Sequence, residues 1–270
     1  MNAALLIAAA LAAAIPAPKA APLLSARDLD PALVLPAPPA TGSAQARAEL
    51  AELHAAEAAR TATEEAAARL DGDTKNATIF AEVLGPGFDL DRLPATSALL
   101  ALVRASEKAT VDRGKDEFKR PRPYAIDTSL KSCKRNDDPL SSYPSGHTSM
   151  AFSMGEILAR LVPEKAAPIL ARSARYAQSR IVCGQHFRSD VSAGQMLGAL
   201  IAERLMTKPA FRAAFDAARR ELVAAGIAAA RSAGGGARTG DTLAGRGHRF
   251  QPGRRDLLAA RNARAIGPGG

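Results

Sequence analysis

The stretch SRIVCGQHFRSDVSAGQMLGALIAERL, residues 179–205, joins a cluster of polar residues to a periodic apolar segment. After Asp190 the apolar side chains recur every three or four residues, which is the period of one face of an α-helix. They are Ala193, Met196, Leu197, Leu200, Ile201 and Leu205. The pattern predicts a helix that buries one face and begins close to His186 and Asp190.

The same helical period runs through most of the chain. It returns between residues 44 and 54, after the candidate N-cap Ser43, and between residues 148 and 161. Hydrophobic residues make up 47% of the 270 residues, whereas aromatic residues make up only 4% and tryptophan is absent. This composition favours helices with small, closely packed faces over a β-sandwich. We predict an all-α fold, with a single compact helical domain over residues 44–230.

The two ends of the chain differ from this body. An apolar run within residues 1–20 predicts a signal peptide cleaved between residues 17 and 21, hence a periplasmic or secreted protein without a membrane span. Residues 21–43 are rich in proline and predict an extended arm. Residues 231–270 are rich in glycine and arginine and predict a disordered tail. This tail carries six of the nine net positive charges and Lys19 one more, so residues 20–230 are nearly neutral.

Residues 119–146 contain four prolines and predict a long ordered loop, a form that in compact domains is usually functional. The loop contains Cys133, and the other cysteine of the chain is Cys183. In an oxidising compartment an isolated pair most simply forms one disulfide, and two buried free thiols are the alternative.

Three polar clusters flank the predicted helices. The first contains Lys115 and Arg122, the second is the turn Pro144-Ser145-Gly146-His147, and the third contains Arg180, His186 and Asp190. Each alone has an ordinary explanation, because loop cations are mostly solvated and a Ser-Gly-His turn can be a plain helix cap. Together, the three cations, the Ser145 hydroxyl and the backbone at Gly146 suit a tetrahedral oxyanion.

The two histidines of these clusters have different neighbours. If residues 186–190 are helical, His186 and Asp190 share a face, and a carboxylate that accepts from Nδ1–H would leave Nε2 free to act as a nucleophile. His147 has no such acidic neighbour and suits the role of a proton donor to a leaving oxygen. This chemistry needs no metal, and the histidines and cysteines show no zinc-like spacing.

The series K-x6-RP, PSGH and SR-x5-H-x3-D resembles the phosphatase signature of the type 2 phosphatidic acid phosphatase superfamily, which includes vanadium haloperoxidases. Within it, SSYPSGHTS and SRIVCGQHFRSDVSAG, together with LPAPPATGSAQARAELAELH and KPAFRAAF, resemble the class A bacterial non-specific acid phosphatases. The resemblance spans roughly residues 35–220 and implies an all-helical acid phosphatase of broad phosphomonoester specificity without a metal or other cofactor.

The resemblance also implies roles for single residues. His186 would be the phosphorylated nucleophile, oriented by Asp190, and His147 the general acid. The phosphate-binding residues would be Lys115, Arg122, Ser145, Gly146 and Arg180. Cys133 and Cys183 lie where relatives often carry a disulfide, and a homo-oligomer inhibited by phosphate or vanadate is implied as well.

Two features depart from the family pattern. Arg113 and Arg120-Pro121 fit the first spacing almost as well as Lys115 and Arg122-Pro123, which we prefer because the family motif begins with lysine. Gln185 replaces an aromatic residue that relatives often have, which leaves substrate preference open.

Two other functions fit the same residues. The anion site could hold vanadate and support a haloperoxidase. Alternatively, the chain could be a non-catalytic envelope protein that binds anionic polymers or surfaces through its basic tail.

Overall fold

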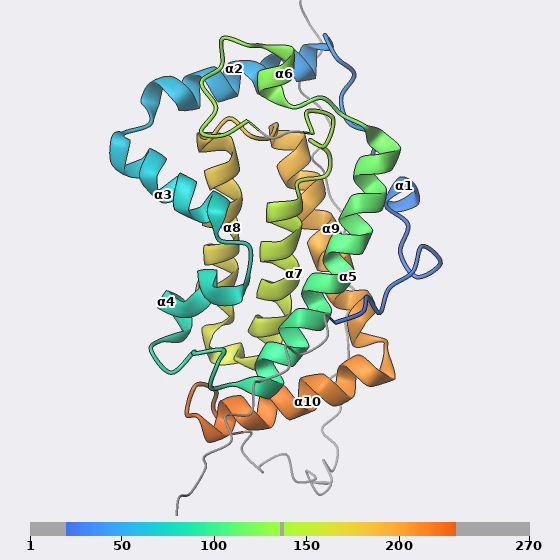
Figure 1. Ribbon diagram of the computed structural model, residues 1–270, viewed down its shortest axis with the longest axis vertical. Helices are drawn as coiled ribbons and strands as arrows, with labels where there is room; N and C mark the ends of the chain where they lie inside the picture. Colours follow the sequence, from blue (N-terminus) through green and yellow to red (C-terminus); the bar gives the residue numbers. More distant parts are fainter. Residues whose placement is uncertain (1–19, 136–137, 231–270) are drawn as a thin grey trace, which may run out of the picture. The chain divides into compact units, whose positions relative to one another are not determined.

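The computed structural model describes residues 20–135 and 138–230, and every regular element in these ranges is helical (Figure 1). The prediction of an all-α fold is confirmed. The predicted tail and all but the last residue of the predicted signal peptide lie outside the described residues. The elements in chain order are α1 (Pro31–Val34), α2 (Ala44–Ala59), α3 (Ala62–Asp73), η1 (Ala77–Phe80), α4 (Ala81–Leu84), α5 (Pro94–Phe118), α6 (Pro123–Ile126), α7 (Gly146–Leu161), η2 (Pro163–Lys165), α8 (Ala166–Val182), α9 (Arg188–Met206) and α10 (Pro209–Ala224).

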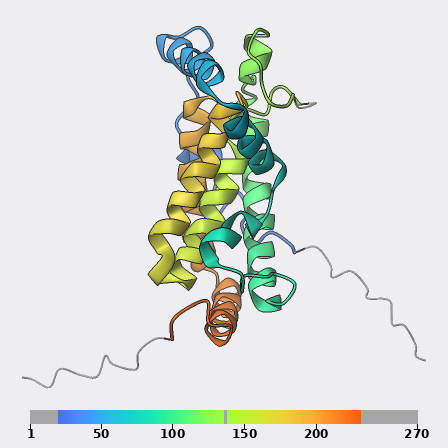
Figure 2. The same ribbon diagram turned by 90° about the vertical axis from the view of Figure 1, so that its left-hand side faces the viewer.

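Helix α7 is the centre of the bundle and packs between α5, α8 and α9 (Figures 1 and 2). It presents buried residues on nearly all sides, as expected for a helix surrounded by others. The apolar residues that set its predicted period are all buried, namely Met150, Met154, Ile157, Leu158 and Leu161. No helix in residues 20–135 or 138–230 is long and apolar enough to cross a membrane.

Two glycines allow α9 to lie close against α7. A Cβ on Gly194 would lie 2.5 Å from the carbonyl oxygen of Ser145, and one on Gly198 would lie 2.7 Å from that of Ser149. The backbones of the two helices therefore meet with no side chain between them. This contact brings their N-terminal ends together, where the Ser145 N–H donates to the Asp190 carbonyl over 3.0 Å.

The end of the bundle at which α5 begins is covered by α10 (Figure 1). The carboxylate of Glu221 on α10 accepts hydrogen bonds from the backbone N–H groups of Ala95 and Thr96 at 2.9 and 2.8 Å. These donors belong to the first turn of α5, which has no capping side chain of its own. Glu221 thus supplies the cap from a distant part of the sequence.

The opposite end of the bundle lies beneath α2, α3 and the long loop (Figure 1). Thr61 and Glu64 form a capping box that ends α2 and starts α3, a break that the apolar period does not reveal. Helix α2 is anchored by Leu53, which belongs to a small apolar cluster with Ile181 and Phe187.

Three details differ from the sequence predictions. The predicted extended arm contains α1 and is packed against the bundle, since Leu24, Leu29 and Leu35 are all buried. The long loop includes one helical turn, α6, and α7 begins at Gly146 rather than near residue 148. In α9, Met196 is 45% exposed although it fits the apolar period.

The contact between α7 and α9 predicts an unusual sign for one substitution. Replacing a helical glycine with alanine normally stabilises a helix by about 0.5–1 kcal/mol. In Gly198→Ala the new methyl would also lie 2.8 Å from the Cβ of Phe152, so we expect a loss of about 1–3 kcal/mol of unfolding free energy instead. Urea denaturation measures this, with Ser192→Ala on the exposed face of α9 as the control. A stabilised Gly198→Ala protein would show that the helices are not in such close contact.

Candidate active site

The predicted site residues gather at the end of the bundle that α2 and α3 cover. They come from one end of each of four helices and from the long loop. Lys115 lies near the end of α5, Arg122 in the loop, Ser145, Gly146 and His147 at the start of α7, Arg180 near the end of α8, and His186 and Asp190 at the start of α9.

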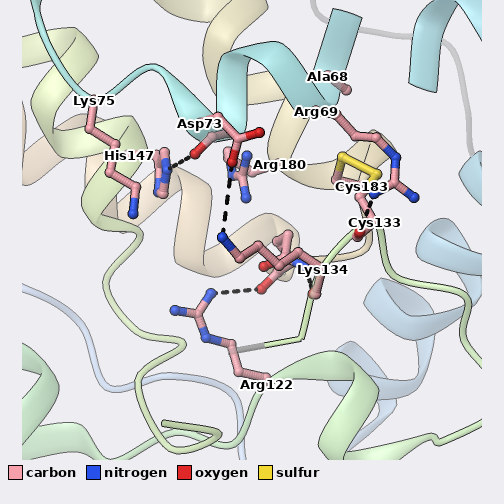
Figure 3. A pocket seen from close by; sticks show the side chains of 12 residues that line it. Ala68, Arg69, Asp73, Lys75, Arg122, Cys133, Lys134, His147, Arg180 and Cys183 are labelled. Atoms are coloured by element: carbon pink, nitrogen blue, oxygen red, sulfur yellow. Dashed lines mark hydrogen bonds and ion pairs between the residues drawn. A yellow bond between two sulfur atoms is a disulfide. The ribbon is translucent and has the colours of Figure 1, made fainter. Parts of the chain in front are cut away.

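A cavity of about 240 Å³ opens at this place, and we call it the first cavity. Arg122, His147 and Arg180 point into it from three different elements (Figure 3). The Cys133–Cys183 disulfide lies on its wall, as do Lys75 and Gln185. His186, Ser145 and Asp190 are buried beside the cavity rather than on its wall.

Arg122 and Arg180 are buried cations with unused hydrogen-bond donors. Arg180 is 4% exposed, and its Nε and Nη1 atoms have no hydrogen-bond partner in the described chain. The Nε atom of Arg122 is unpartnered as well. Burial lowers the pKa of Arg180 to about 10, and the proximity of Arg122 adds to this effect. Buried guanidinium groups normally meet carboxylates, so this pair indicates a site for a bound anion.

His186 is held by a backbone carbonyl and not chiefly by Asp190. Its Nδ1 lies 2.8 Å from the Ser142 carbonyl oxygen and 3.5 Å from the Asp190 Oδ2. A carbonyl can only accept, so Nδ1 carries the proton and Nε2 the lone pair. Arg122 donates from Nη1 to this Nε2 over 2.9 Å. Asp190 is thus within 3.5 Å of His186, but the two residues do not share a helical face, because His186 precedes α9. The Ser142 carbonyl is the nearer partner of Nδ1.

Both histidines are kept neutral by their surroundings. Burial, and next the charge of Arg122, holds the pKa of His186 well below its usual value. Burial and Arg180 do the same for His147. The His147 Nε2–H donates to the carbonyl oxygen of Gly72 over 2.9 Å, which leaves Nδ1 as its free ring nitrogen (Figure 3).

Gly72 has two functions in this arrangement. It accepts the hydrogen bond from His147, and it lets Arg180 approach, because a Cβ at this position would lie 2.6 Å from Nη1 of Arg180. Asp71 joins α3 to α8 by accepting from Arg172 at 2.5 Å and from the Ser179 hydroxyl at 2.6 Å. Helix α3 is thereby fixed over the site.

Asp190 connects the elements beneath the site. Its carboxylate is fully buried and accepts from the Ser142 hydroxyl at 2.6 Å, the Phe187 N–H at 2.8 Å and Arg120 at 2.6 Å. Burial raises the pKa of Asp190 to about 6 against the opposing effect of Arg120 and the hydrogen bonds. Ser142 also links the two residues, because its hydroxyl donates to Asp190 and its carbonyl accepts from His186.

The structure separates the two candidate spacings of the first cluster. Arg120 pairs with Asp190 and with Glu49, 3.1 Å away, and stacks on the Phe187 ring. Arg113 faces the arm and donates to the Leu29 carbonyl. Lys115 and Arg122, the preferred pair, lie at the cavities instead.

A second cavity, of about 170 Å³, adjoins the first and shares Lys75 and His147 with it. Lys115 and Gly146 line this second cavity. A Cβ on Gly146 would lie 3.6 Å from the Lys115 ammonium, which is an ordinary contact, so this cation lies close to the start of α7. Burial, and next the charge of Arg122, lowers the pKa of Lys115.

Ser145 forms the N-cap of α7. Its hydroxyl oxygen accepts from the Thr148 hydroxyl at 3.0 Å and, at the longer distance of 3.5 Å, from the Thr148 N–H. These contacts use the acceptor side of the Ser145 hydroxyl. Its own proton can therefore still be donated to an anion.

Cys133 and Cys183 form the predicted disulfide, with their Cα atoms 4.9 Å apart. The bond joins the long loop to the end of α8, and the Cys133 N–H donates to the Cys183 carbonyl over 3.0 Å. Gln185, the departure from the family pattern, is buried and donates to Ser132 and to the Lys134 carbonyl. It therefore helps to hold the loop against the site.

The sequence analysis did not find Gly72 or Lys75. The signal for Gly72 was an isolated glycine in a helical pattern, which often marks a close approach of another group. Lys75 gave no signal, because a lysine next to a helix end is usually solvated. Among residues 20–135 and 138–230, no group of three or more His, Cys, Asp or Glu residues is placed to hold a metal ion.

Replacing Arg120 or Arg122 by methionine should reduce the stability of the fold to very different extents. Arg120→Met leaves the buried carboxylates of Asp190 and Glu49 without their cation, so we expect a loss of about 3–5 kcal/mol of unfolding free energy. Arg122→Met removes a cation that faces no carboxylate, so stability should change by about 1 kcal/mol or less. Denaturant unfolding of both variants measures the difference. Equal destabilisation would contradict these two environments.

Comparisons with known proteins agree with this geometry. The model of the PAP2 superfamily matches residues 95–213. An acid phosphatase from Zymomonas mobilis is 34% identical over 200 residues, which cover 72% of this chain and 75% of the relative. A non-specific acid phosphatase from Salmonella typhi is 32% identical over 151 residues, covering 54% and 60%. One from Providencia stuartii is 28% identical over 208 residues, covering 74% and 84%. The chain therefore belongs to the PAP2 superfamily and, within it, to the bacterial acid phosphatases, as its three motifs predicted.

Proposed function

We propose that this acid phosphatase hydrolyses phosphate monoesters in two steps through a phosphohistidine at His186. The observation that carries the proposal is the buried pair Arg122 and Arg180, whose unused N–H groups lie beside a histidine with a fixed tautomer. Membership among the acid phosphatases supports the reaction class. The geometry supports the division of roles between His186 and His147.

The phosphate would lie between Arg122, Arg180 and Lys115. The hydroxyl of Ser145 and the backbone at Gly146 face the same place from the start of α7, where partial positive charge favours anions. Phosphoryl transfer requires mainly positioning and neutralisation of the equatorial oxygens. Lys115, Arg122 and Arg180, which have few counter-charges, would supply both the positioning and the neutralisation.

In the first step, the Nε2 lone pair of His186 forms a bond to phosphorus as the bond to the leaving oxygen breaks. His147 first takes up a proton at Nδ1 from solvent as the anionic substrate binds, and it gives this proton to the leaving oxygen while its Nε2–H stays bonded to Gly72. In the second step, water attacks phosphorus, the P–N bond breaks, and His147 accepts the proton from water. The products are an alcohol and phosphate, and both histidines return to their initial states.

Access to His186 requires one movement. In the unliganded protein the Nη1 of Arg122 donates to the Nε2 that would attack phosphorus, and His186 is 1% exposed. A phosphate oxygen is a stronger acceptor than a neutral imidazole. Substrate would therefore take over this donor and uncover the nucleophile.

Further properties follow from the same proposal. An alcohol in place of water would receive the phosphoryl group, which gives phosphotransferase activity. Phosphate and vanadate would compete for the anion site. Assembly as a homo-oligomer and location in the periplasm or outside the cell stay predictions from the sequence and the family.

His186→Ala should abolish turnover of p-nitrophenyl phosphate, with a loss of at least about 10²-fold, in buffer that contains EDTA. His54→Ala is the matched control, because His54 is half-exposed and bound to Asp127 at the protein surface. Rapid quenching followed by mass spectrometry should find the phosphoryl group on His186 of the wild type. Wild-type activity that needs added metal, or a quenched enzyme labelled elsewhere, would contradict the mechanism.

The lowered pKa values of His186 and His147 fix the sign of the pH dependence. For His186, a depressed pKa keeps this nucleophile neutral below pH 6.5, so protonation of His186 should not reduce activity as the pH falls from 7 to 5. His147 must carry a proton to act as the acid, and burial and Arg180 lower its pKa as well, so kcat/KM should fall as the pH rises from 5 towards 9. A constant rate from pH 5 to pH 9 would refute this assignment.

The role of His147 can be separated by comparing leaving groups. We expect His147→Asn to slow an alkyl phosphate by about 10²-fold or more, since an alkoxide leaves poorly without a proton. The same variant should affect p-nitrophenyl phosphate much less, because nitrophenolate needs no proton. Equal losses for the two substrates would assign His147 to phosphate binding instead.

A further inference from the structure

The second cavity is lined mainly by cations. Lys75, Arg104, Lys108 and Lys115 face it, against the single carboxylate of Asp112. Asp112 is already paired with Lys108 at 2.5 Å. In the first cavity, by comparison, the nearest acidic residue, Asp73, has Lys134 as its partner (Figure 3). The second cavity thus holds more positive charge than its own carboxylate neutralises.

Arg104 is one of three cations of this cavity that the phosphatase mechanism does not use, together with Lys75 and Lys108. Its guanidinium is 34% exposed and pairs with Glu107, which is buried one turn further along α5. Burial raises the pKa of Glu107 to about 7, against the effect of Arg104 and Lys115 and with that of Asp112. Protonation of this carboxyl would leave Arg104 without a counter-charge.

Lys75 lies where the two cavities meet. Burial lowers its pKa, and Lys134, Arg104 and Arg180 add to the effect. Lys75, Lys134, Arg104 and Arg180, from four separate parts of the chain, therefore repel one another. Asp73 offsets this repulsion only in part, and a second anion bound in the second cavity would relieve it further.

We propose that the second cavity binds a second phosphate group carried by the alcohol part of the substrate, so that organic bisphosphates are preferred over matched monophosphates. This inference rests on the proposed function, since it names the substrate class of the same site. Because His147 lines both cavities, a leaving group bound in the second cavity keeps its oxygen beside the proton donor. Arg104 would contact the remote phosphate directly.

The test compares the monophosphate and the bisphosphate of one alkanediol, in a series of three to six carbons, at pH 5.5 and constant ionic strength. The two equivalent phosphates of a bisphosphate give a statistical factor of two in kcat/KM. Beyond it, we expect a preference of about tenfold at the chain length that spans the two cavities, as for one charge-assisted hydrogen bond. A wild-type ratio of two at every length would overturn the inference.

Variants of Arg104, Glu107 and Lys134 test where the second phosphate binds. Arg104→Gln combined with Glu107→Gln keeps a neutral hydrogen-bonded pair in the core, and it should lower the preference about fivefold while the monophosphate reacts as before. Glu107→Gln alone leaves Arg104 without a counter-charge and should keep the high preference up to pH 7.5. Lys134→Gln, which lines only the first cavity, should leave the ratio unchanged.

The outcomes also separate the two proposals. Turnover of the monophosphate with no bisphosphate preference refutes only the second-phosphate site. A preference that disappears in Lys134→Gln, but persists in the Arg104 and Glu107 double variant, places the second phosphate in the first cavity and refutes the site proposed here. Absence of turnover with every ester refutes the proposed function and this inference together.

Discussion

The buried carboxylate of Asp190 is the interaction on which the geometry of the site depends. It binds the long loop through Ser142, the start of α9 through the Phe187 N–H, and α2 indirectly through Arg120 and Glu49. Its backbone carbonyl accepts from Ser145 at the start of α7. The long loop, the starts of α7 and α9, and α2 are therefore all held at one buried residue. A carboxylate in this position is stable because each of its oxygens has a donor.

The cations at the cavity, Arg122 and Arg180, differ from Arg120 because no carboxylate is paired with them in the described chain. Arg120 has two carboxylate partners, whereas Arg122 has backbone, hydroxyl and imidazole partners. Both Arg122 and Arg180 also have unused donors. Burying a cation without a counter-charge costs free energy that the rest of the fold must supply. A bound phosphate would recover part of this cost, which favours affinity for an anion. The two arginines of the KRPRP segment differ in this respect although they are two residues apart.

The sequence was most informative where a local pattern determined the result. The helical period predicted α7 and most of α9 because burial follows that period, and it failed at Met196, where no neighbouring element covers the face. The three motifs located the site because helix ends and a proline-rich loop meet at one end of the bundle. Lys115 and Arg122 could be preferred over Arg113 and Arg120 only through the resemblance, since spacing alone fits both pairs.

What the sequence could not predict depends on contacts between distant segments. The Ser142 carbonyl that holds His186 is 44 residues away, and Gly72, which holds His147, is 75 residues away. Backbone carbonyls leave no signature in a sequence, because every residue has one. The nearby Asp190 therefore seemed the natural partner of His186, although the carboxylate is occupied by Ser142, Phe187 and Arg120. The sequence could not show that Arg104 and Lys75 line the same cavity, since this depends on how α5 and the segment after α3 pack.

The use of carbonyls as partners explains how two histidines so close together can have different tasks. A carboxylate at Nδ1 would fix the tautomer but also favour the protonated ring, which cannot attack phosphorus. A carbonyl fixes the tautomer without adding a negative charge, while burial and the surrounding cations lower the pKa values of both histidines. Under the proposed mechanism, the negative charge of the substrate phosphate would favour protonation of His147, so the general acid would form when there is a leaving group to protonate.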